Sequence, residues 1–346
     1  MKRPVVRAGP RRPWTWRTTN LALLGVLAAA FATGVAAQAT GSSRGAWVPV
    51  AHGAVGLVVV ALLPRKSRVV ASGMRRRRAS RWASVALAAL ALATLAAGMG
   101  SATGVPGPVG GFESLWVHIA LALLLIPLLA WHALARPVRP PRAADLGRRT
   151  LVRAGLLAAA GSALYTGLDS VVRLADLPGA QRRFTGSRAV AAAPVTSWLD
   201  DAVPHVRGDE WRLSVTDAGG TRSLSLDDLV ASGTTAVRAT LDCTSGWYAT
   251  QTWAGVPVAR LLTDVGPGHR SVRVRSLTGY DRYLPLSDLD HLVLAVAVGG
   301  APLTPGHGYP ARLVAPGRRG FWWVKWVVGI ELSGRPWWAQ SPFPLA

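Results

Sequence analysis

Residues 114–135 read Ser114-Leu-Trp-Val-His-Ile-Ala-Leu-Ala-Leu-Leu-Leu-Ile-Pro-Leu-Leu-Ala-Trp-His-Ala-Leu-Ala135 and carry no Asp, Glu, Lys or Arg. A helix that crosses the hydrocarbon core of a bilayer needs about 20 consecutive apolar residues. Helices in the cores of soluble proteins rarely run this long without a charge. The stretch therefore predicts a membrane-spanning helix.

Four other apolar runs flank this stretch, at about Asn20–Ala39, Ala46–Leu63, Ala83–Met99 and Leu151–Leu168. Each is close to the length of a membrane span. The last run is the weakest, because it contains an arginine and several hydroxyl residues. We therefore expect a membrane α-helical bundle of about five helices in the first half of the chain.

The basic residues predict how this bundle is oriented. The chain has 346 residues and a net charge of +22. Nineteen Lys and Arg residues lie in the alternate segments 1–19, 64–82 and 136–149, and one lies in segments 40–45 and 100–113. Loops rich in Lys and Arg stay in the cytoplasm. The N-terminus is therefore expected inside and everything after the fifth helix outside. Membrane topology accounts for the charge, and no nucleic-acid partner is expected.

Two histidines lie at matching depth in the predicted bundle. His52 follows Trp47 by five residues and His118 follows Glu113 by five, on helices that run in the same direction. Both therefore lie roughly 7–8 Å below the outer boundary. Two imidazoles at one depth can ligate a haem iron from opposite faces, which predicts one haem b there. The alternatives are that both histidines only bond neighbouring helices, or that the deeper His132 is a ligand.

Residues 176–346 differ from the first half, with more acidic residues and with turns rich in Gly and Pro. Four segments have the β-branched content and alternation of strands: Trp211–Val215, Val237–Leu241, Ser271–Arg275 and Leu292–Val296. Leu226–Val230 and Val258–Leu262 are typical of short helices, and Ser225 with Asp228 forms a capping pattern before the first. The mixture predicts an α+β domain.

The chain has a single cysteine, Cys243, in the sequence Leu241-Asp-Cys-Thr-Ser-Gly-Trp247 after a predicted strand. One cysteine excludes an internal disulfide and a zinc site built from several thiolates. A lone cysteine is most often an inert buried thiol. A cysteine hydrolase would need a histidine partner, and no histidine of this half lies in a recognisable hydrolase context.

Three blocks of the second half resemble the molybdopterin-binding domain of the sulfite oxidase family, over about residues 195–333. The first block joins Cys243-Thr-Ser-Gly-Trp247 to Trp253-Ala-Gly-Val-Pro-Val-Ala-Arg-Leu-Leu262. The second comprises Gly300-Ala-Pro-Leu303, His307-Gly-Tyr-Pro-Ala-Arg-Leu-Val-Ala-Pro-Gly317 and Gly320-Phe-Trp-Trp-Val-Lys-Trp-Val-Val-Gly-Ile-Glu331. The third is Thr278-Gly-Tyr-Asp-Arg-Tyr-Leu-Pro-Leu286. The pattern is similar to the bacterial exported branch, which includes periplasmic methionine-sulfoxide reductases with a haem-bearing membrane partner.

The resemblance implies a molybdenum–molybdopterin cofactor. It implies that Cys243 is the protein thiolate on molybdenum, which suits a soft metal. It places His307 and Arg312 at positions that bind the cofactor phosphate, and Lys325 at another cofactor contact. Arginine is well suited to phosphate because its donors bind two oxygens at once.

The remaining site candidates are weaker. Sulfite oxidases proper carry an arginine shortly after the metal cysteine, whereas here none follows until Arg260, which argues against sulfite as substrate. Tyr280 is a candidate catalytic acid or base, and Tyr283 is a second; packing is the alternative role for both. Residues 182–187, Arg-Arg-Phe-Thr-Gly-Ser, are a further candidate for reaching the cofactor.

Arg148 and Arg149 stand just before the fifth apolar run, in Gly147-Arg-Arg-Thr-Leu-Val-Arg-Ala-Gly155. Paired arginines before a mildly apolar helix look like a twin-arginine export signal. Such export suits a domain that is loaded with its cofactor in the cytoplasm and crosses the membrane folded. The alternative is that the pair only contributes to topology.

The predicted organisation is a basic N-terminus, a four-helix haem module, a basic loop with the fifth helix, a linker and a molybdopterin domain, at residues 1–19, 20–135, 136–170, 171–194 and 195–346. The expected function is a membrane-anchored oxidoreductase that transfers an oxygen atom on a small substrate and exchanges electrons with quinone or another carrier. The alternative is a membrane-tethered binding or assembly protein without catalysis.

Overall fold

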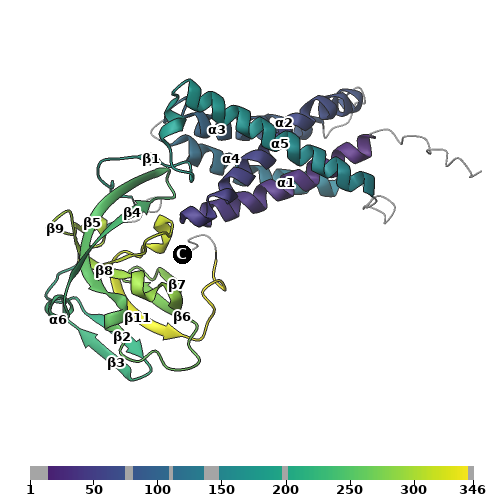
Figure 1. Cartoon of the computed structure of the whole chain (residues 1–346). Coiled ribbons are helices and arrows are strands. Elements are labelled where there is room, and N and C mark those ends of the chain that lie inside the picture. Colours follow the sequence, from purple (N-terminus) through teal and green to yellow (C-terminus); the bar gives the residue numbers. More distant parts are fainter. Residues whose placement is uncertain (1–14, 75–80, 109–111, 136–147, 197–201, 342–346) are drawn as a thin grey trace, which may run out of the picture.

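The computed structural model describes residues 15–74, 81–108, 112–135, 148–196 and 202–341 (Figure 1). Five long helices form the N-terminal part: α1 Trp16–Ala39, α2 Trp47–Met74, α3 Arg81–Thr103, α4 Ser114–Ala135 and α5 Arg148–Leu174. All five are long and apolar enough to cross a membrane, by length and composition. Helix α1 packs against α2, α3 against α4, and α5 against α2.

Among the five helices, α2 differs most from the apolar run that predicted it. The predicted run ends at Leu63, but the helix continues through Pro64 to Met74. Arg and Lys, which are frequent after Pro64, are good helix formers, so the basic residues extend the helix beyond the apolar span. Lys66 Nζ donates to Asn20 Oδ1 of α1 at 3.0 Å, which ties the extension to the neighbouring helix.

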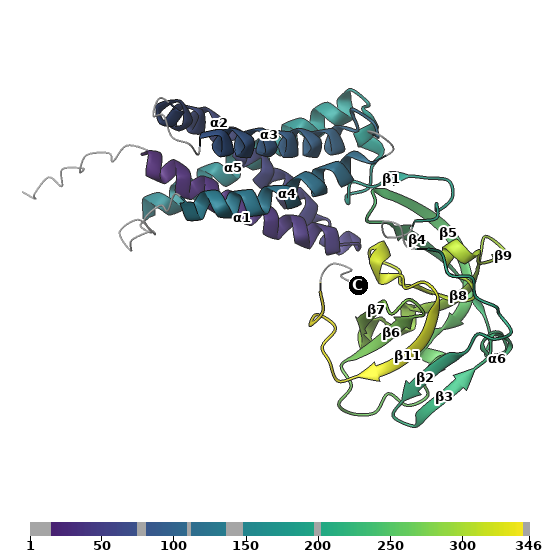
Figure 2. The ribbon, with the colours of Figure 1, turned by 180° about the vertical axis from the view of Figure 1, so that it is seen from behind.

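The C-terminal part contains two β-sheets (Figures 1 and 2). The first has the order β1-β5-β8-β10, with β4 paired to β5 and β9 to β8. Its strands are β1 Arg188–Ala189, β4 Thr235–Asp242, β5 Trp247–Pro257, β8 Val293–Val298, β9 Ala301–Pro302 and β10 Arg312–Val314. The second has the order β3-β2-β11-β6-β7. Its strands are β2 Leu213–Asp217, β3 Gly220–Leu224, β6 Ser271–Ser276, β7 Asp281–Pro285 and β11 Val327–Ser333.

Short helices connect these strands: α6 Leu226–Ala231, α7 Val258–Leu261, and the 3₁₀ turns η4 Leu286–His291, η5 Pro305–His307 and η6 Gly320–Trp322. A further 3₁₀ turn, η3 Pro178–Gln181, lies between α5 and β1. The predicted cap of α6 is confirmed, because the Asp228 N–H donates to Ser225 Oγ and the Ser225 N–H donates to the Asp228 carboxylate. The predicted α+β mixture is also confirmed, and the four predicted strands overlap β2, β4, β6 and β8.

The core of this part is formed by side chains from both sheets. Leu213 and Ile330 of the second sheet and Leu294 of the first are fully buried. Trp253 on β5 is the largest fully buried residue, and its ring meets Trp323 edge-on at a centroid distance of 5.5 Å. In both views β1 and the adjacent end of β5 lie closest to the helical bundle, so the bundle stands over one end of the first sheet (Figures 1 and 2).

Candidate active site

Cys243 begins a tight turn between β4 and β5. The N–H of Cys243 donates to the Trp247 carbonyl at 2.8 Å, and the N–H of Gly246 donates to the Cys243 carbonyl at 3.2 Å. Gly246 has a φ of 95°, a conformation that favours glycine. Ser245 Oγ donates to Cys243 Sγ at 3.0 Å. The thiolate is the form of cysteine that binds a metal.

Arg319, which the sequence analysis did not single out, hydrogen-bonds to the two residues at the start of this turn. Its side chain is 1% exposed; Nη1 donates to Asp242 Oδ1 at 2.9 Å and Nη2 to the Cys243 carbonyl at 3.2 Å. The paired arginines of Pro316-Gly-Arg-Arg-Gly320 in a largely apolar block were the available sequence signal. Arg319 therefore fixes the backbone on which the only cysteine is carried.

The segment at residues 182–187 does reach this place. Thr185 Oγ1 and Ser187 Oγ each donate to the Asp242 carboxylate at 2.8 Å, and Arg183 Nε lies 3.4 Å from Asp242 Oδ2. The Arg183 guanidinium also lies over the Tyr248 ring, 5.5 Å from its centroid. Asp242 thus joins the segment after α5 to the cysteine turn.

Arg312 lies at the start of β10 and is 2% exposed. Its guanidinium stacks on Trp253 and Trp323, at 5.1 and 5.9 Å from their ring centroids, and Nη1 donates to the His307 carbonyl at 3.1 Å. Its Nε is buried without a hydrogen-bond partner. Burial lowers the pKa of Arg312 to about 10, and a negative charge on nearby Cys243 opposes that shift.

Lys325 lies beside Arg312. Its Nζ donates to the carbonyls of Thr196 and Gly306, both at 2.7 Å. Burial, and then the positive charge of Arg312, lower the pKa of Lys325 to about 8. Gly308, with a φ of 103°, sits between the two cations: a Cβ there would lie 3.0 Å from Lys325 Cβ and 3.1 Å from Arg312 Cβ. The structure therefore brings Cys243, Arg312 and Lys325 into one neighbourhood.

His307 lies next to this neighbourhood, but its ring is engaged by protein atoms. Nε2 donates to the Ala193 carbonyl at 2.9 Å, and Nδ1 lies 2.7 Å from Thr304 Oγ1. Contact with a phosphate through this ring would require one of these two hydrogen bonds to be exchanged. In the described conformation it is the His307 backbone carbonyl that touches the site, by accepting from Arg312.

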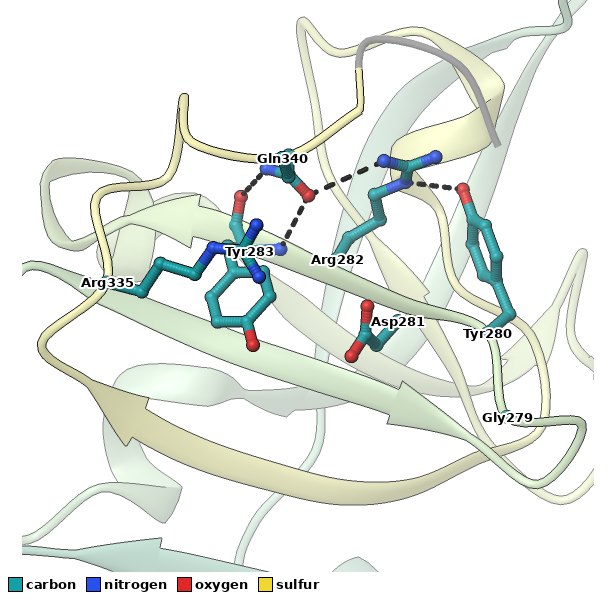
Figure 3. Close-up of a pocket in the computed structure, with 7 residues that line it drawn as sticks. All are labelled: Gly279, Tyr280, Asp281, Arg282, Tyr283, Arg335 and Gln340. Carbon is teal, nitrogen blue, oxygen red and sulfur yellow. Dashed lines mark hydrogen bonds between the residues drawn. The ribbon is translucent and has the colours of Figure 1, made fainter. Parts of the chain in front are cut away.

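Tyr280 lies in a polar pocket lined by Gly279–Tyr283, Arg335 and Gln340 (Figure 3). Its hydroxyl donates to the Phe321 carbonyl and accepts from Arg282 Nε at 2.6 Å. Burial raises the pKa of Tyr280. Tyr283 lies between the guanidiniums of Arg273 and Arg335. The Tyr280 hydroxyl thus has two protein partners, and a catalytic role for either tyrosine stays a prediction.

The donor set around Cys243 suits an anionic molybdenum cofactor. Among residues 15–74, 81–108, 112–135, 148–196 and 202–341, neither Arg312 nor Lys325 forms an ion pair with a carboxylate. A buried cation without a counter-charge is costly, so buried Arg312 beside half-buried Lys325 indicates an anionic occupant. A thiol that can ionise beside them supplies a soft metal ligand.

A second arrangement of interest lies inside the helical bundle. The ring centroids of His52 on α2 and His118 on α4 are 6.0 Å apart, with an angle of 67° between the planes. His52 Nδ1 lies 3.0 Å from the Ala30 carbonyl, and His118 Nδ1 lies 2.8 Å from the Thr94 carbonyl. Both Nδ1 atoms therefore act as donors, and each Nε2 is the basic nitrogen that could ligate a metal.

Two glycines make room for these rings. A Cβ at Gly34 would lie 3.1 Å from His52 Cε1, and one at Gly98 would lie 3.0 Å from His118 Nδ1. Each glycine stands four residues after the carbonyl that its histidine contacts, at Ala30 and Thr94. This repeated spacing is a sequence signal that was missed. His132 lies 14 residues further along α4, toward the opposite end of that helix.

Comparison with known proteins bears on the C-terminal part. Residues 200–341 match the family model described as the oxidoreductase molybdopterin binding domain. Rat (Rattus norvegicus) mitochondrial sulfite oxidase is 30% identical over 166 residues, which are 38% of this chain and 30% of that protein. The protein-methionine-sulfoxide reductase catalytic subunit MsrP of Xanthomonas campestris is 32% identical over 129 residues, which are 32% of this chain and 40% of that protein.

Among solved structures, the sulfane dehydrogenase SoxCD of Paracoccus pantotrophus is 25% identical, with a TM-score of 0.37, over 38% of this chain and 40% of that chain. The chain thus spans less than half the length of each of these relatives. The matches fall on the part of the chain that carries Cys243, Arg312 and Lys325. The C-terminal part of the chain is therefore an oxidoreductase molybdopterin-binding domain, related to those of sulfite oxidase and methionine-sulfoxide reductase.

Proposed function

We propose that the protein is a membrane-anchored molybdenum oxidoreductase that transfers an oxygen atom to or from a small substrate. The observation that carries this proposal is the grouping of a buried cation, Arg312, and a half-buried cation, Lys325, beside the only cysteine, with no carboxylate paired to either cation among the described residues. Without a bound anion, the desolvation of these positive charges lowers the stability of the fold, so the group is not expected in a domain that binds nothing.

In this proposal each residue of the site has a separate task. The Cys243 thiolate is the protein ligand of molybdenum, and Ser245 stabilises its negative charge. Arg312, whose guanidinium contacts the rings of two tryptophans, and Lys325 bind the anionic part of the cofactor. His307 holds the Arg312 side chain through its backbone carbonyl and is a further candidate for the cofactor phosphate. When bound, the cofactor supplies the two-electron chemistry of oxygen-atom transfer.

The membrane part of the proposal has α1–α4 as an electron carrier with haem b. His52 and His118 would hold the haem iron through their Nε2 atoms, because both Nδ1 atoms are engaged by backbone carbonyls. The centroids of the two rings lie 6.0 Å apart. Hydrogen bonds from Nδ1 to backbone carbonyls fix ring orientation, as in many histidine metal sites.

The electrons would be exchanged with a quinone. In the reductive direction a quinol gives two electrons and two protons, and a substrate oxide takes them up and is released without its oxygen, together with water. The oxidative direction is the reverse. A haem held by His52 and His118 would supply one-electron steps between the quinone and the molybdenum site. The helices would place the N-terminus in the cytoplasm and the molybdopterin domain outside, with export through the twin-arginine machinery directed by Arg148 and Arg149.

Metal analysis of the purified full chain tests the enzyme proposal. We expect about one molybdenum per chain, and we expect Cys243→Ser to lose turnover because a neutral hydroxyl is a poor ligand for a soft metal. Thr250→Ser, an exposed conservative change on β5, is the matched control and should keep both metal and turnover. Active protein without molybdenum would overturn the proposal. A folded, metal-free, inactive protein would favour the alternative, a tethered binding or assembly protein.

A further inference from the structure

The outer end of α4 contacts the cysteine turn directly. Glu113, immediately before α4, accepts from Arg188 Nε of β1 at 2.5 Å. The N–H of Arg188 donates to the Gly246 carbonyl at 2.9 Å. Glu113 also packs on Gly246 itself, because a Cβ at Gly246 would lie 3.2 Å from Glu113 Cβ. One side of the Cys243–Gly246 turn is therefore covered by a residue of the bundle.

The connection between α1 and α2 contacts Arg318 and Arg319, and Arg319 hydrogen-bonds to the same turn. A Cβ at Gly41 would lie 2.6 Å from the backbone of both Arg318 and Arg319, so only glycine fits there. Arg319 is the residue that holds Asp242 and the Cys243 carbonyl. Ser42 lies next to Gly317 in the same way, with its Cβ 3.9 Å from a Cβ built on that glycine.

We infer that these contacts form a fixed docking junction between the helical bundle and the cysteine turn, with its register set by the ion pair of Glu113 and Arg188. The Glu113 side chain is 10% exposed, whereas that of Arg188 is 49% exposed. An ion pair with one buried partner adds little net stability, but it selects one arrangement over its neighbours, which apolar helix ends do not. Glu113 is thus a positioning residue.

The junction has a functional consequence, which rests on the proposed haem and molybdenum centres. His118 follows Glu113 by five residues on α4, a rise of about 7.5 Å. The N–H of Gly246 donates to the Cys243 carbonyl, so Gly246 is one hydrogen bond away from Cys243. A route between the two proposed metal ligands therefore passes from the start of α4 to Gly246, which Glu113 and Leu115 both contact. Electrons would travel singly along it, in either direction, between haem and molybdenum.

The test uses the full chain in lipid nanodiscs. Glu113→Gln, Arg188→Gln and the exchanged pair Glu113→Arg with Arg188→Glu are compared with Arg207→Gln, which removes an exposed ion-pair arginine far from the junction. The first measurement is the rate at which dithionite-reduced haem is reoxidised by methionine sulfoxide. The second is dye-driven reduction of the same probe at molybdenum. The third is amide hydrogen exchange of residues 243–247.

We expect each single variant at the junction to slow haem reoxidation at least tenfold and to increase exchange of residues 243–247, with dye-driven turnover within about twofold of wild type. The exchanged pair should recover both properties, and Arg207→Gln should change neither. Unchanged exchange in Glu113→Gln would overturn the docking junction, and normal haem reoxidation with increased exchange would overturn the electron route. A wild type without haem or turnover would instead refute the proposed function, and the exchange measurement would still decide the junction.

Discussion

Lys325 gives the most direct physical test of the cofactor site. In the cofactor-free protein, burial and Arg312 lower its pKa from 10.5 to about 8. Between these two pH values the unfolded chain keeps the lysine proton and the folded chain does not. Stability therefore increases as the pH rises through this window. The difference between the two pKa values corresponds to about 3 kcal/mol in the free energy of unfolding.

The variant Lys325→Met removes this titrating group. Loss of its two hydrogen bonds to Thr196 and Gly306 costs stability at every pH, so the readout is the pH dependence and not the absolute value. Protein made without the cofactor is unfolded with guanidinium and followed by tryptophan fluorescence from neutral pH to pH 10.5. Wild type should gain up to about 3 kcal/mol relative to Lys325→Met across this range.

Two controls make the result specific to this site. Arg207→Gln, which removes an exposed cation, should keep the wild-type pH dependence. Protein loaded with the cofactor should lose most of this pH dependence of stability, because a bound anion raises the pKa of Lys325. Identical pH dependence in wild type and Lys325→Met, both without cofactor, would refute the reasoning.

Two further predictions concern the helical bundle and the arginine pair at the start of α5. His52→Ala and His118→Ala should each abolish a low-spin b-type haem spectrum while the protein keeps its molybdenum, and His132→Ala should leave the spectrum intact; haem lost only in His132→Ala would move the site to the other end of α4. Arg148→Lys together with Arg149→Lys should leave the C-terminal domain in the cytoplasm, as reported by a fusion after residue 346, because lysines keep the charge but not the twin-arginine signal. Unchanged export would mean that the pair contributes only to topology.

The amino-acid sequence alone predicted the elements and the neighbourhood of the reactive residues. The apolar stretch Ser114–Ala135 coincides with α4, because the length of an uncharged run directly limits the helix that it forms. Ser225 and Asp228 cap α6 as expected, since a capping box depends on residues only three positions apart. The matching depths of His52 and His118 could also be counted along two helices of known rise.

Only the tertiary structure decided which side chains meet. Arg319 reaches Asp242, 77 residues earlier in the chain, and the Ser187 hydroxyl reaches the same carboxylate across 55 residues. The His307 ring is turned toward Ala193, 114 residues away, and Glu113 meets Arg188 across 75. Such contacts depend on how sheets and helices pack, and that packing is a sum of many weak interactions which no local pattern contains. Local periodicity therefore determined the helices and strands, and long-range packing determined the site that they build.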